Sequence, residues 1–164
     1  MIRDVIGYVL GLVIFIIAIP FAMYLASGSP DLALIQWIML ILFAFVGIGL
    51  SVWSIVYMKN VGKGNPFDAF NHEVAPRTSS LMTDGPYGIC RNPMLLGVFV
   101  YHIGVLIALL SIGALIVFII EVIIMNVQVK REEQRLKSDF GNDYVEYAKR
   151  VNRFLPKLGG IRNV

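Results

Sequence analysis

Long apolar runs, separated by short polar segments, dominate the chain. One run extends from residue 5 to 25 and a second from 32 to about 58, and two shorter runs cover 94–110 and 113 to about 125. A helix needs about 20 apolar residues to cross the ~30 Å hydrocarbon core of a bilayer. The pattern therefore predicts an all-α integral membrane protein with about four transmembrane helices, the last two forming a hairpin that spans the membrane or enters it deeply.

Details within the first two apolar runs bear on how these helices are held. The first run is longer than the ~7–15 residues of a signal-peptide core, so we expect a retained membrane helix rather than a cleaved signal peptide. Its Pro20 removes one backbone hydrogen bond and is expected to kink the helix. The second run contains the small residues Gly47, Gly49 and Ser51, which in lipid allow two helices to approach closely.

The segments outside the apolar runs differ from one another. Residues 59–84 are rich in Gly, Pro, Asn, Ser and Thr without a helical or strand period, which predicts a loop outside the bilayer. Residues 126–137 instead continue the last apolar run with good helix formers. Gly141 follows as a helix end, and a further helix can start at Asn142 or Asp143. We therefore expect a C-terminal helical extension that projects from the membrane.

Composition and charge agree with a membrane protein and add an orientation. Hydrophobic residues make up 57% of the 164 residues, against about 45–50% in soluble domains. Most Lys and Arg residues follow the last apolar run, so the positive-inside rule places this tail, residues 59–84 and both termini in the cytoplasm. The net charge is +3, and we expect its basic residues to face the lipid bilayer and not nucleic acid. No metal site is expected, because the single cysteine, Cys90, has no Cys or His neighbours at ligand spacing.

A polar, Pro-bounded stretch at residues 85–97 leads into the third helix. It brings Tyr87, Arg91 and Asn92 to the predicted cytoplasmic entrance of that helix. Pro93 suits the first helical turn, where the free backbone amides can bind an anionic group. We interpret the stretch as the rim of an active site, although Arg91 taken alone is more often an anchor at the membrane surface than a ligand.

The fourth helix carries a polar stripe that runs from the membrane interior toward the cytoplasm. Glu121, Gln128 and Glu132 are spaced so that they share one helical face, which predicts the wall of a cavity. His102 lies about as far from the hairpin tip as Glu121, so we predict an intramembrane pair between them, either catalytic or serving only to lock the hairpin. Glu132 and the neighbouring Glu133 either hold a cationic ligand group or form a solvated face.

Several short motifs occur together in roughly the C-terminal two thirds of the chain. They are Gly85-Pro86-Tyr87, Arg91-Asn92-Pro93-Met94 with Gly97, Glu132-Glu133, Phe140-Gly141 with Tyr144 and Tyr147, and Arg150-Val151 before Pro156; Gly62-Lys63-Gly64-Asn65-Pro66 lies upstream. Together they resemble the isoprenylcysteine carboxyl methyltransferase and phospholipid methyltransferase superfamily, and its bacterial or archaeal members in particular.

The resemblance implies a membrane-embedded enzyme that uses S-adenosylmethionine, with a cofactor pocket closed by the C-terminal helices and a lipid-facing entrance for a lipophilic acceptor. It divides the predicted single domain, 1–164, into a two-helix membrane scaffold, 1–58, and a cofactor-binding and catalytic part, 59–164. The implied cofactor-binding residues are Ser79, Ser80, Leu81, Met82, Tyr87, Asn92, Pro93, Met94, Leu95 and Glu132. The candidate catalytic residues are Arg91, Gln128, Glu121 and Glu133, of which Glu121 or Glu133 would remove the proton of an amine acceptor.

The chain departs from the superfamily pattern at three positions. Asn92 and Leu95 stand where the motif has His and Tyr, and Gln128 replaces an arginine that in the prenylcysteine enzymes is proposed to hold the substrate carboxylate. A neutral amide does not neutralise a carboxylate as a guanidinium does. We therefore expect a small lipophilic or lipid-headgroup acceptor, methylated on a carboxylate oxygen or an amine nitrogen, rather than a prenylated protein terminus.

Two other classes of protein fit the same apolar pattern. One is a membrane reductase of the sterol-reductase type, which would use NADPH. The other is a non-enzymatic four-helix membrane protein, such as a small transporter subunit, in which Glu121 would be the coupling carboxylate. Binding of S-adenosylhomocysteine or of NADPH separates the three.

Overall fold

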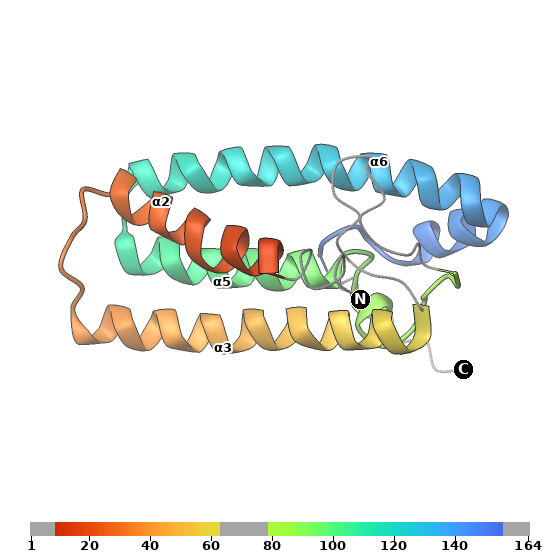
Figure 1. Cartoon of the computed structure of the whole chain (residues 1–164), viewed down its shortest axis with the longest axis horizontal. Coiled ribbons are helices and arrows are strands. Elements are labelled where there is room, and N and C mark those ends of the chain that lie inside the picture. Colours follow the sequence, from red (N-terminus) through yellow and green to blue (C-terminus); the bar gives the residue numbers. More distant parts are fainter. Residues whose placement is uncertain (1–8, 63–78, 156–164) are drawn as a thin grey trace.

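The protein is all-helical, apart from short connections, over the residues that the computed structural model describes, 9–62 and 79–155 (Figure 1). The first helix, Val9–Ala26, contains a π-helical section η1 (Val13–Ala18) and the α-helix α2 (Ile19–Ala26). The later elements are α3 (Leu34–Tyr57) with its π-helical continuation η2 (Met58–Gly62), the short α4 (Pro86–Ile89), α5 (Pro93–Leu109) and α6 (Ile112–Arg150).

Among the described residues, three helices are long and apolar enough to cross a bilayer: Val9–Ala26, Leu34–Gly62 and Ile112–Arg150. α5 is also apolar but has 17 residues, a length of ~26 Å at 1.5 Å per residue. These helices confirm the predicted all-α membrane architecture, whereas a fourth crossing by α5 stays a prediction. The second helix continues to Gly62, beyond the predicted end near residue 58. Most of the predicted 59–84 loop, and most of the upstream glycine motif, lie outside the described residues.

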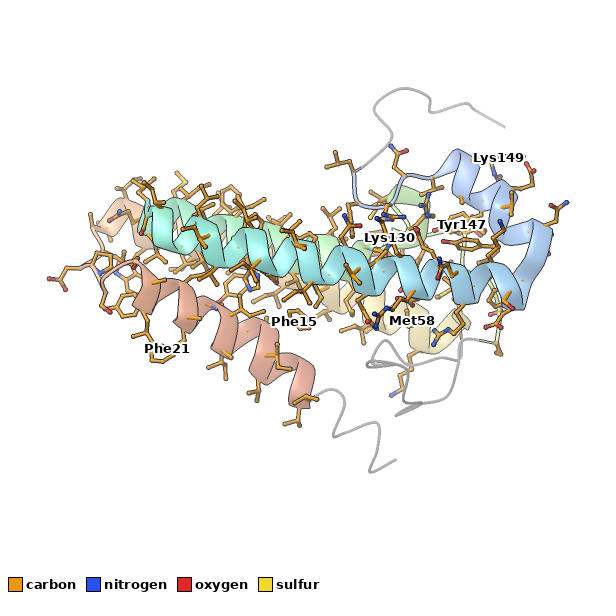
Figure 2. All side chains as sticks on the ribbon, turned by 90° about the horizontal axis from the view of Figure 1, so that it is seen from above. Phe15, Phe21, Met58, Lys130, Tyr147 and Lys149 are labelled. Carbon is orange, nitrogen blue, oxygen red and sulfur yellow. The ribbon has the colours of Figure 1, made fainter. Side chains whose placement is uncertain are left out.

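Consecutive long helices run antiparallel, and the molecule has an apolar end and a polar end (Figures 1 and 2). α3 packs mainly against α5, and α2 packs against α6. The connections 27–33 and 110–111 lie at the apolar end, whereas α4 and the polar half of α6 form the other end. Figure 2 shows nitrogen and oxygen atoms gathered mainly around Lys130, Tyr147 and Lys149. The polar motifs of the sequence therefore share one end of the bundle.

α3 and α5 approach each other closely where small residues face one another. A Cβ atom added at Gly47 would overlap the carbonyl oxygen of Gly97, and one added at Gly97 would overlap the Ser51 hydroxyl. Ser51 Oγ also donates to the carbonyl oxygen of Met94 at 2.9 Å. The predicted role of small residues is confirmed for Gly47 and Ser51, whereas a Cβ at Gly49 would meet no atom within 4 Å.

The first helix is irregular beside Pro20, which has no amide hydrogen. In α-helical geometry an amide at residue 20 would donate to the carbonyl of Ile16, and in π-helical geometry to that of Phe15. Both carbonyls instead accept hydrogen bonds from α5, from Tyr101 Oη at 3.3 Å and from His102 Nε2 at 2.8 Å. The helix beside Pro20 is thus a widened turn, in which two carbonyls accept hydrogen bonds from a neighbouring helix.

α6 reverses direction at Gly141 (Figure 1), where the sequence predicted the end of one helix and the start of another. Gly141 has φ +55° and ψ −124°, a combination that glycine alone adopts readily. The helix then continues to Arg150, and its side chains Tyr144 and Tyr147 are buried. The reversal brings residues 151–155 back toward the start of α5, where they complete the polar end.

Candidate functional site

A cavity of about 400 Å³ lies at the polar end of the molecule, within the ~300–1,000 Å³ range of small-molecule and cofactor sites. One part, the polar pocket, is lined by Tyr87, Arg91, Asn92, Gln128, Glu132 and Glu133. The other part, the apolar arm, is lined by side chains of the first helix, α3 and α5, namely Phe15, Ile16, Ile48, Val52, Val98 and Tyr101. The cavity thus joins polar groups to the membrane helices.

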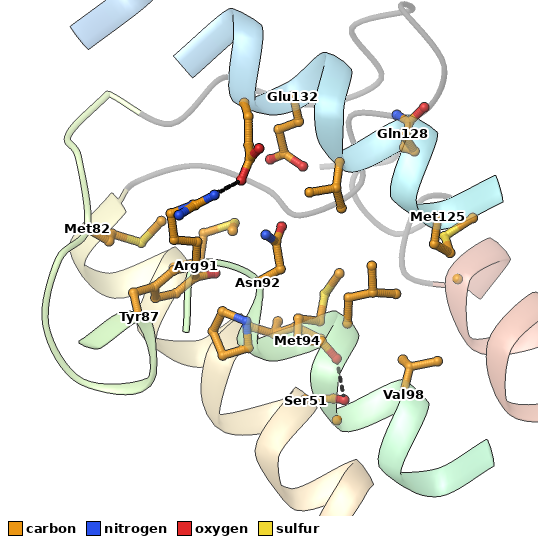
Figure 3. Close-up of a pocket in the computed structure, with 18 of the residues that line it drawn as sticks. Ser51, Met82, Tyr87, Arg91, Asn92, Met94, Val98, Met125, Gln128 and Glu132 are labelled. Atoms are coloured by element: carbon orange, nitrogen blue, oxygen red, sulfur yellow. Dashed lines mark hydrogen bonds and ion pairs between the residues drawn. The ribbon is translucent and has the colours of Figure 1, made fainter. Parts of the chain in front are cut away.

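α6 supplies one wall of the polar pocket. Met125, Gln128 and Glu132 line it, and Figure 3 shows the last two on the face of α6 that looks toward Asn92. Glu132 lies in the polar part of α6, and its carboxylate is 4.0 Å from Arg135 Nη2, at the limit of an ion pair. Burial raises the pKa of Glu132, and the neighbouring carboxylate raises it further. A cationic ligand group would relieve both effects.

Glu133 is held between two guanidinium groups. Arg91 Nη2 lies 2.6 Å from Glu133 Oε1, and Arg153 Nη2 lies 2.5 Å from Oε2. Arg91 Nη1 also donates to the carbonyl oxygens of Ala148 at 3.1 Å and Val151 at 2.6 Å. Burial alone would raise the pKa of Glu133, but the hydrogen bonds from Arg153 and Arg91 outweigh it and hold the pKa below its ordinary value. This cluster ties the start of α5 to α6 and to the C-terminal segment.

Backbone hydrogen bonds join the same two segments. The Arg91 amide donates to the Asn152 carbonyl at 2.8 Å, and the Asn92 amide donates to the Arg153 carbonyl at 3.1 Å. These contacts narrow the set of free amides at this helix start, where the predicted anion site stays a prediction. The returning C-terminal segment, which the sequence pattern does not bring here, already occupies the amides of Arg91 and Asn92.

The residues implied as cofactor-binding converge on the cavity, with one exception. Ser79 is absent from the described lining, and its amide donates to the carbonyl of Gly62 at 2.9 Å. Among the described residues, none accepts a hydrogen bond from the backbone amides of Met94 or Leu95, so these helix-start donors remain for a ligand. The implied residues that line the cavity are Ser80, Leu81, Met82, Tyr87, Asn92, Pro93, Met94, Leu95 and Glu132.

The first half of the short helix α4, Pro86 and Tyr87, is buried. Gly85 precedes it with φ +58°, and a Cβ there would overlap a neighbouring tyrosine ring. The hydroxyl of Tyr147 donates to the carbonyl of Tyr87 at 2.7 Å. Burial raises the pKa of the Tyr87 phenol, and it raises the pKa of the Cys90 thiol to about 11. Both side chains are therefore protonated at neutral pH, and Tyr87 offers the cavity a hydrogen-bond donor.

His102 and Glu121 form a buried pair nearer the middle of the bundle. His102 Nδ1 lies 2.7 Å from Glu121 Oε2, which confirms the predicted pairing of α5 with α6. Neither residue belongs to the cavity lining. Of the candidate catalytic residues, Arg91, Gln128 and Glu133 therefore meet at the cavity, and Glu121 does not.

Arg153 is a site residue that the sequence did not single out. Besides pairing with Glu133, Arg153 donates a hydrogen bond from Nη1 to Asn126 Oδ1 at 2.9 Å. Its approach depends on the chain reversal at Gly141, so a pattern of basic residues in the tail does not reveal it. The available signal was the neighbouring Arg150-Val151 motif.

Comparison with known proteins agrees with this geometry. The family described as phospholipid methyltransferase matches residues 35–143. The mouse protein-S-isoprenylcysteine O-methyltransferase is 30% identical over 140 residues, which cover 81% of this chain and 46% of the mouse protein. The rat protein of the same name is 33% identical over 97 residues, 57% of this chain and 34% of the rat protein. The chain thus spans less than half the length of these curated relatives, and no solved structure gives a significant match. The matches confirm the resemblance inferred from the motifs.

Proposed function

Since the chain belongs to the phospholipid methyltransferase family, we propose that it is an integral membrane methyltransferase that uses S-adenosylmethionine and acts on a lipophilic or lipid-headgroup acceptor. The observation that carries the proposal is a single cavity that joins a polar pocket, holding Glu132, to an apolar arm among membrane helices. The names of the mouse and rat relatives specify an isoprenylated cysteine as their acceptor, which is consistent with an apolar arm.

The polar pocket fits the charged groups of S-adenosylmethionine. Glu132 would hold the ammonium group, because its carboxylate lines the cavity and has a raised pKa, with Arg135 Nη2 no closer than 4.0 Å. The unpaired amides of Met94 and Leu95, with the side chain of Asn92, would hold the carboxylate. Met82 and Leu95 would contact the adenine. When bound, the cofactor supplies an electrophilic methyl group on a sulfonium sulfur.

The charge of the polar pocket bears on the acceptor. Among the described lining residues, Arg91 is the one cation, and it pairs with Glu133, which Arg153 also contacts. Gln128, on the adjacent turn of α6, is neutral. Among these lining residues, a carboxylate acceptor would therefore meet no cation outside that ion-paired cluster. This favours an uncharged or amine-bearing acceptor, such as a small lipophilic molecule or a lipid headgroup, over a prenylated protein terminus.

Neither candidate proton acceptor is free to act as a base. Both oxygens of Glu133 accept hydrogen bonds from guanidinium groups, and Glu121 lies outside the cavity lining. The acceptor atom would then enter with its lone pair available, as an unprotonated amine or an oxygen nucleophile. Catalysis would rest on positioning within a water-poor cavity.

Calorimetry on detergent-purified protein tests the cofactor. We expect S-adenosylhomocysteine to bind and NADPH not to bind. Glu132→Ala should weaken the binding about ten- to a hundredfold, because it removes a charged hydrogen-bond partner. Glu146→Ala, at an exposed carboxylate on the outer face of α6, is the matched control and should bind like the parent. Folded protein that binds NADPH but not S-adenosylhomocysteine would overturn the proposal in favour of a reductase.

Transfer of a radioactive methyl group from S-adenosylmethionine to membrane lipid extracts tests the acceptor. A methyl ester releases methanol on mild alkaline hydrolysis, whereas a methylated amine keeps the label. Label that stays non-volatile after alkali supports an amine headgroup, and volatile label supports a carboxylate. The absence of any labelled lipid with protein that binds S-adenosylhomocysteine would contradict a lipid acceptor.

A further inference from the structure

A buried polar pair that does not line the cavity connects three helices. His102 Nδ1 faces Glu121 Oε2 at 2.7 Å, and at the other edge of the ring Nε2 lies 2.8 Å from the Phe15 carbonyl. A carbonyl only accepts, so Phe15 assigns a proton to Nε2, and one further proton must lie between Nδ1 and Glu121. The pair is therefore neutral as a whole, which suits its place within the membrane helices.

Tyr101, next to His102 in the sequence, makes a parallel contact. Its hydroxyl donates to the carbonyl of Ile16 at 3.3 Å. Pro20 has no amide hydrogen, so it cannot donate to the carbonyl of either Phe15 or Ile16. Two adjacent side chains of α5 bind these two adjacent carbonyls instead. Both contacts lie in the irregular part of the first helix.

The first helix is held most firmly at the apolar end. There Met23 is fully buried, and a Cβ on Gly113 would overlap the Ala26 carbonyl. From there the helix diverges from α6 toward its N-terminal end (Figures 1 and 2). In the diverging half Ile17 is more than half exposed, whereas Phe15 packs against a core cluster of α5 and α6. The two tethers add directional contacts to this packing and help to fix where the diverging half lies.

The tethered residues also form part of the cavity. Phe15, Ile16 and Tyr101 line the apolar arm, across from residues of α3. We propose that Tyr101, His102 and Glu121 are positioning residues that hold the first helix at a fixed separation from α3, and so set the width of the apolar arm and the acceptor chains that it admits. The specificity role rests on the proposed function, because it takes the arm as the acceptor site.

The separation of the two helices can be measured without any acceptor. Ile17→Cys and Ile41→Cys put nitroxide labels on the first helix and on α3, at exposed positions outside the cavity lining. The fully buried Cys90 stays unlabelled. Double electron–electron resonance of the labelled parent should give one narrow distance distribution.

Removing the tethers should broaden or shift that distribution. The variants are Tyr101→Phe, which deletes one oxygen, and Tyr101→Phe combined with His102→Phe. Glu121→Gln should keep the parent distribution, because the glutamine amide can donate to His102 Nδ1 while His102 Nε2 still donates to the Phe15 carbonyl. Tyr24→Phe, on the first helix and away from both tethers, is the matched control. An unchanged distribution in folded Tyr101→Phe and in the double variant would overturn the proposal, and so would equal broadening in the control.

Acceptor selectivity tests the second half of the proposal. With aminophospholipids of short, medium and long acyl chains as probes, Tyr101→Phe should change the KM ratio between the longest and shortest acceptor by about fivefold. Tyr24→Phe, outside the cavity lining, should keep both the parent KM ratio and the parent kcat. A shifted distance with unchanged KM ratios would overturn the specificity role. A parent that methylates none of the probes would count against the proposed acceptor class, whereas the distance measurement decides the positioning role independently.

Discussion

At the scale of single residues, Glu132 and Glu133 are neighbours with opposite surroundings. Glu133 has both oxygens held by Arg91 and Arg153, and its pKa lies below the ordinary value. Glu132 faces the polar pocket, and its pKa lies above the ordinary value. Adjacent helical residues point about 100° apart, so one carboxylate meets the returning C-terminal segment and the other meets the cavity. One acidic pair thereby supplies a structural carboxylate and a ligand-facing one.

Glu133→Gln should destabilise the protein by about 1–3 kcal/mol, because two guanidinium groups would face each other without a carboxylate between them. Breaking a fully buried pair costs ~3–5 kcal/mol, and the 14% exposure of the Glu133 side chain reduces this value. Glu146→Gln removes the partner of Lys149 in an exposed pair and should leave the unfolding temperature nearly unchanged. Thermal unfolding of both variants in one detergent measures the difference, and equal shifts would contradict the structural role of Glu133.

Binding of S-adenosylhomocysteine should release protons in the pH range of the raised Glu132 pKa. In the free protein, a folded pKa above the unfolded value means that the folded state gains stability from Glu132 as pH falls through that pKa. A bound ammonium group favours the charged form, so affinity should fall as the pocket is acidified. Calorimetry in buffers of different ionisation enthalpy measures the released protons, and Glu132→Gln should abolish the release. A parent that releases none would show that Glu132 does not meet the ligand.

At the scale of elements, the crossing of α3 and α5 fixes the floor of the cavity. Gly47 and Gly97 bring the two backbones together, and Ser51 links α3 to the carbonyl of Met94 in the first turn of α5. The same turn carries the unpaired amides of the polar pocket. The position of these donors therefore depends on how closely the two helices approach.

Gly47→Ala should destabilise the protein by about 1–3 kcal/mol, the usual cost of overpacking a closely packed contact. Its Cβ would overlap backbone atoms of α5, which cannot move aside as a flexible side chain can. Gly49→Ala, two residues along the same helix, would meet no atom within 4 Å and should be neutral or slightly stabilising. Chemical or thermal unfolding of the two variants tests the difference. Similar losses of stability in both variants would show that the cost does not come from packing between α3 and α5.

Local signals explain how much of this architecture could be predicted. The apolar runs specify the helices, Gly141 marks the break in the last one, and helical spacing alone places Gln128 with Glu132 on one wall. The pairing of His102 with Glu121 follows from equal depth on a tight hairpin. Two contacts could not be predicted. The Arg91 amide meets a segment about sixty residues away, and Arg153 meets Glu133 about twenty residues away. Both contacts depend on the direction of the turn at Gly141, which is set by ψ as well as φ. Prediction therefore succeeded along helices and failed where the C-terminal segment returns.

At the scale of the whole molecule, apolar and polar ends are separated along the helix axes (Figure 2). The cavity lies at the polar end, with its apolar arm reaching between the membrane helices. An acceptor with an apolar chain could keep that chain at membrane depth while its headgroup meets the polar pocket. The predicted orientation puts this end in the cytoplasm.

Cysteine labelling in sealed vesicles tests that orientation and the span of the hairpin. Ile112→Cys lies at the apolar end and Lys149→Cys at the polar end, and both positions are exposed. If the hairpin crosses the bilayer with the positive tail inside the cell, a membrane-impermeant maleimide should label only Ile112→Cys in right-side-out vesicles. It should label only Lys149→Cys in inverted vesicles. Labelling of both from one side would show that the hairpin enters the membrane without crossing it.

The hydrogen bonds from Arg91 and Asn92 to residues 152 and 153 also set the order of assembly during synthesis. The ribosome releases the start of α5 well before it reaches the segment that covers it. Until then the two amides lack these carbonyl partners, and Glu133 lacks one of its guanidinium groups. A nascent chain can thus be inserted and helical while its pocket is still unfinished. A stop codon just after Arg150 would leave a membrane protein of nearly normal helix content that cannot close around a cofactor.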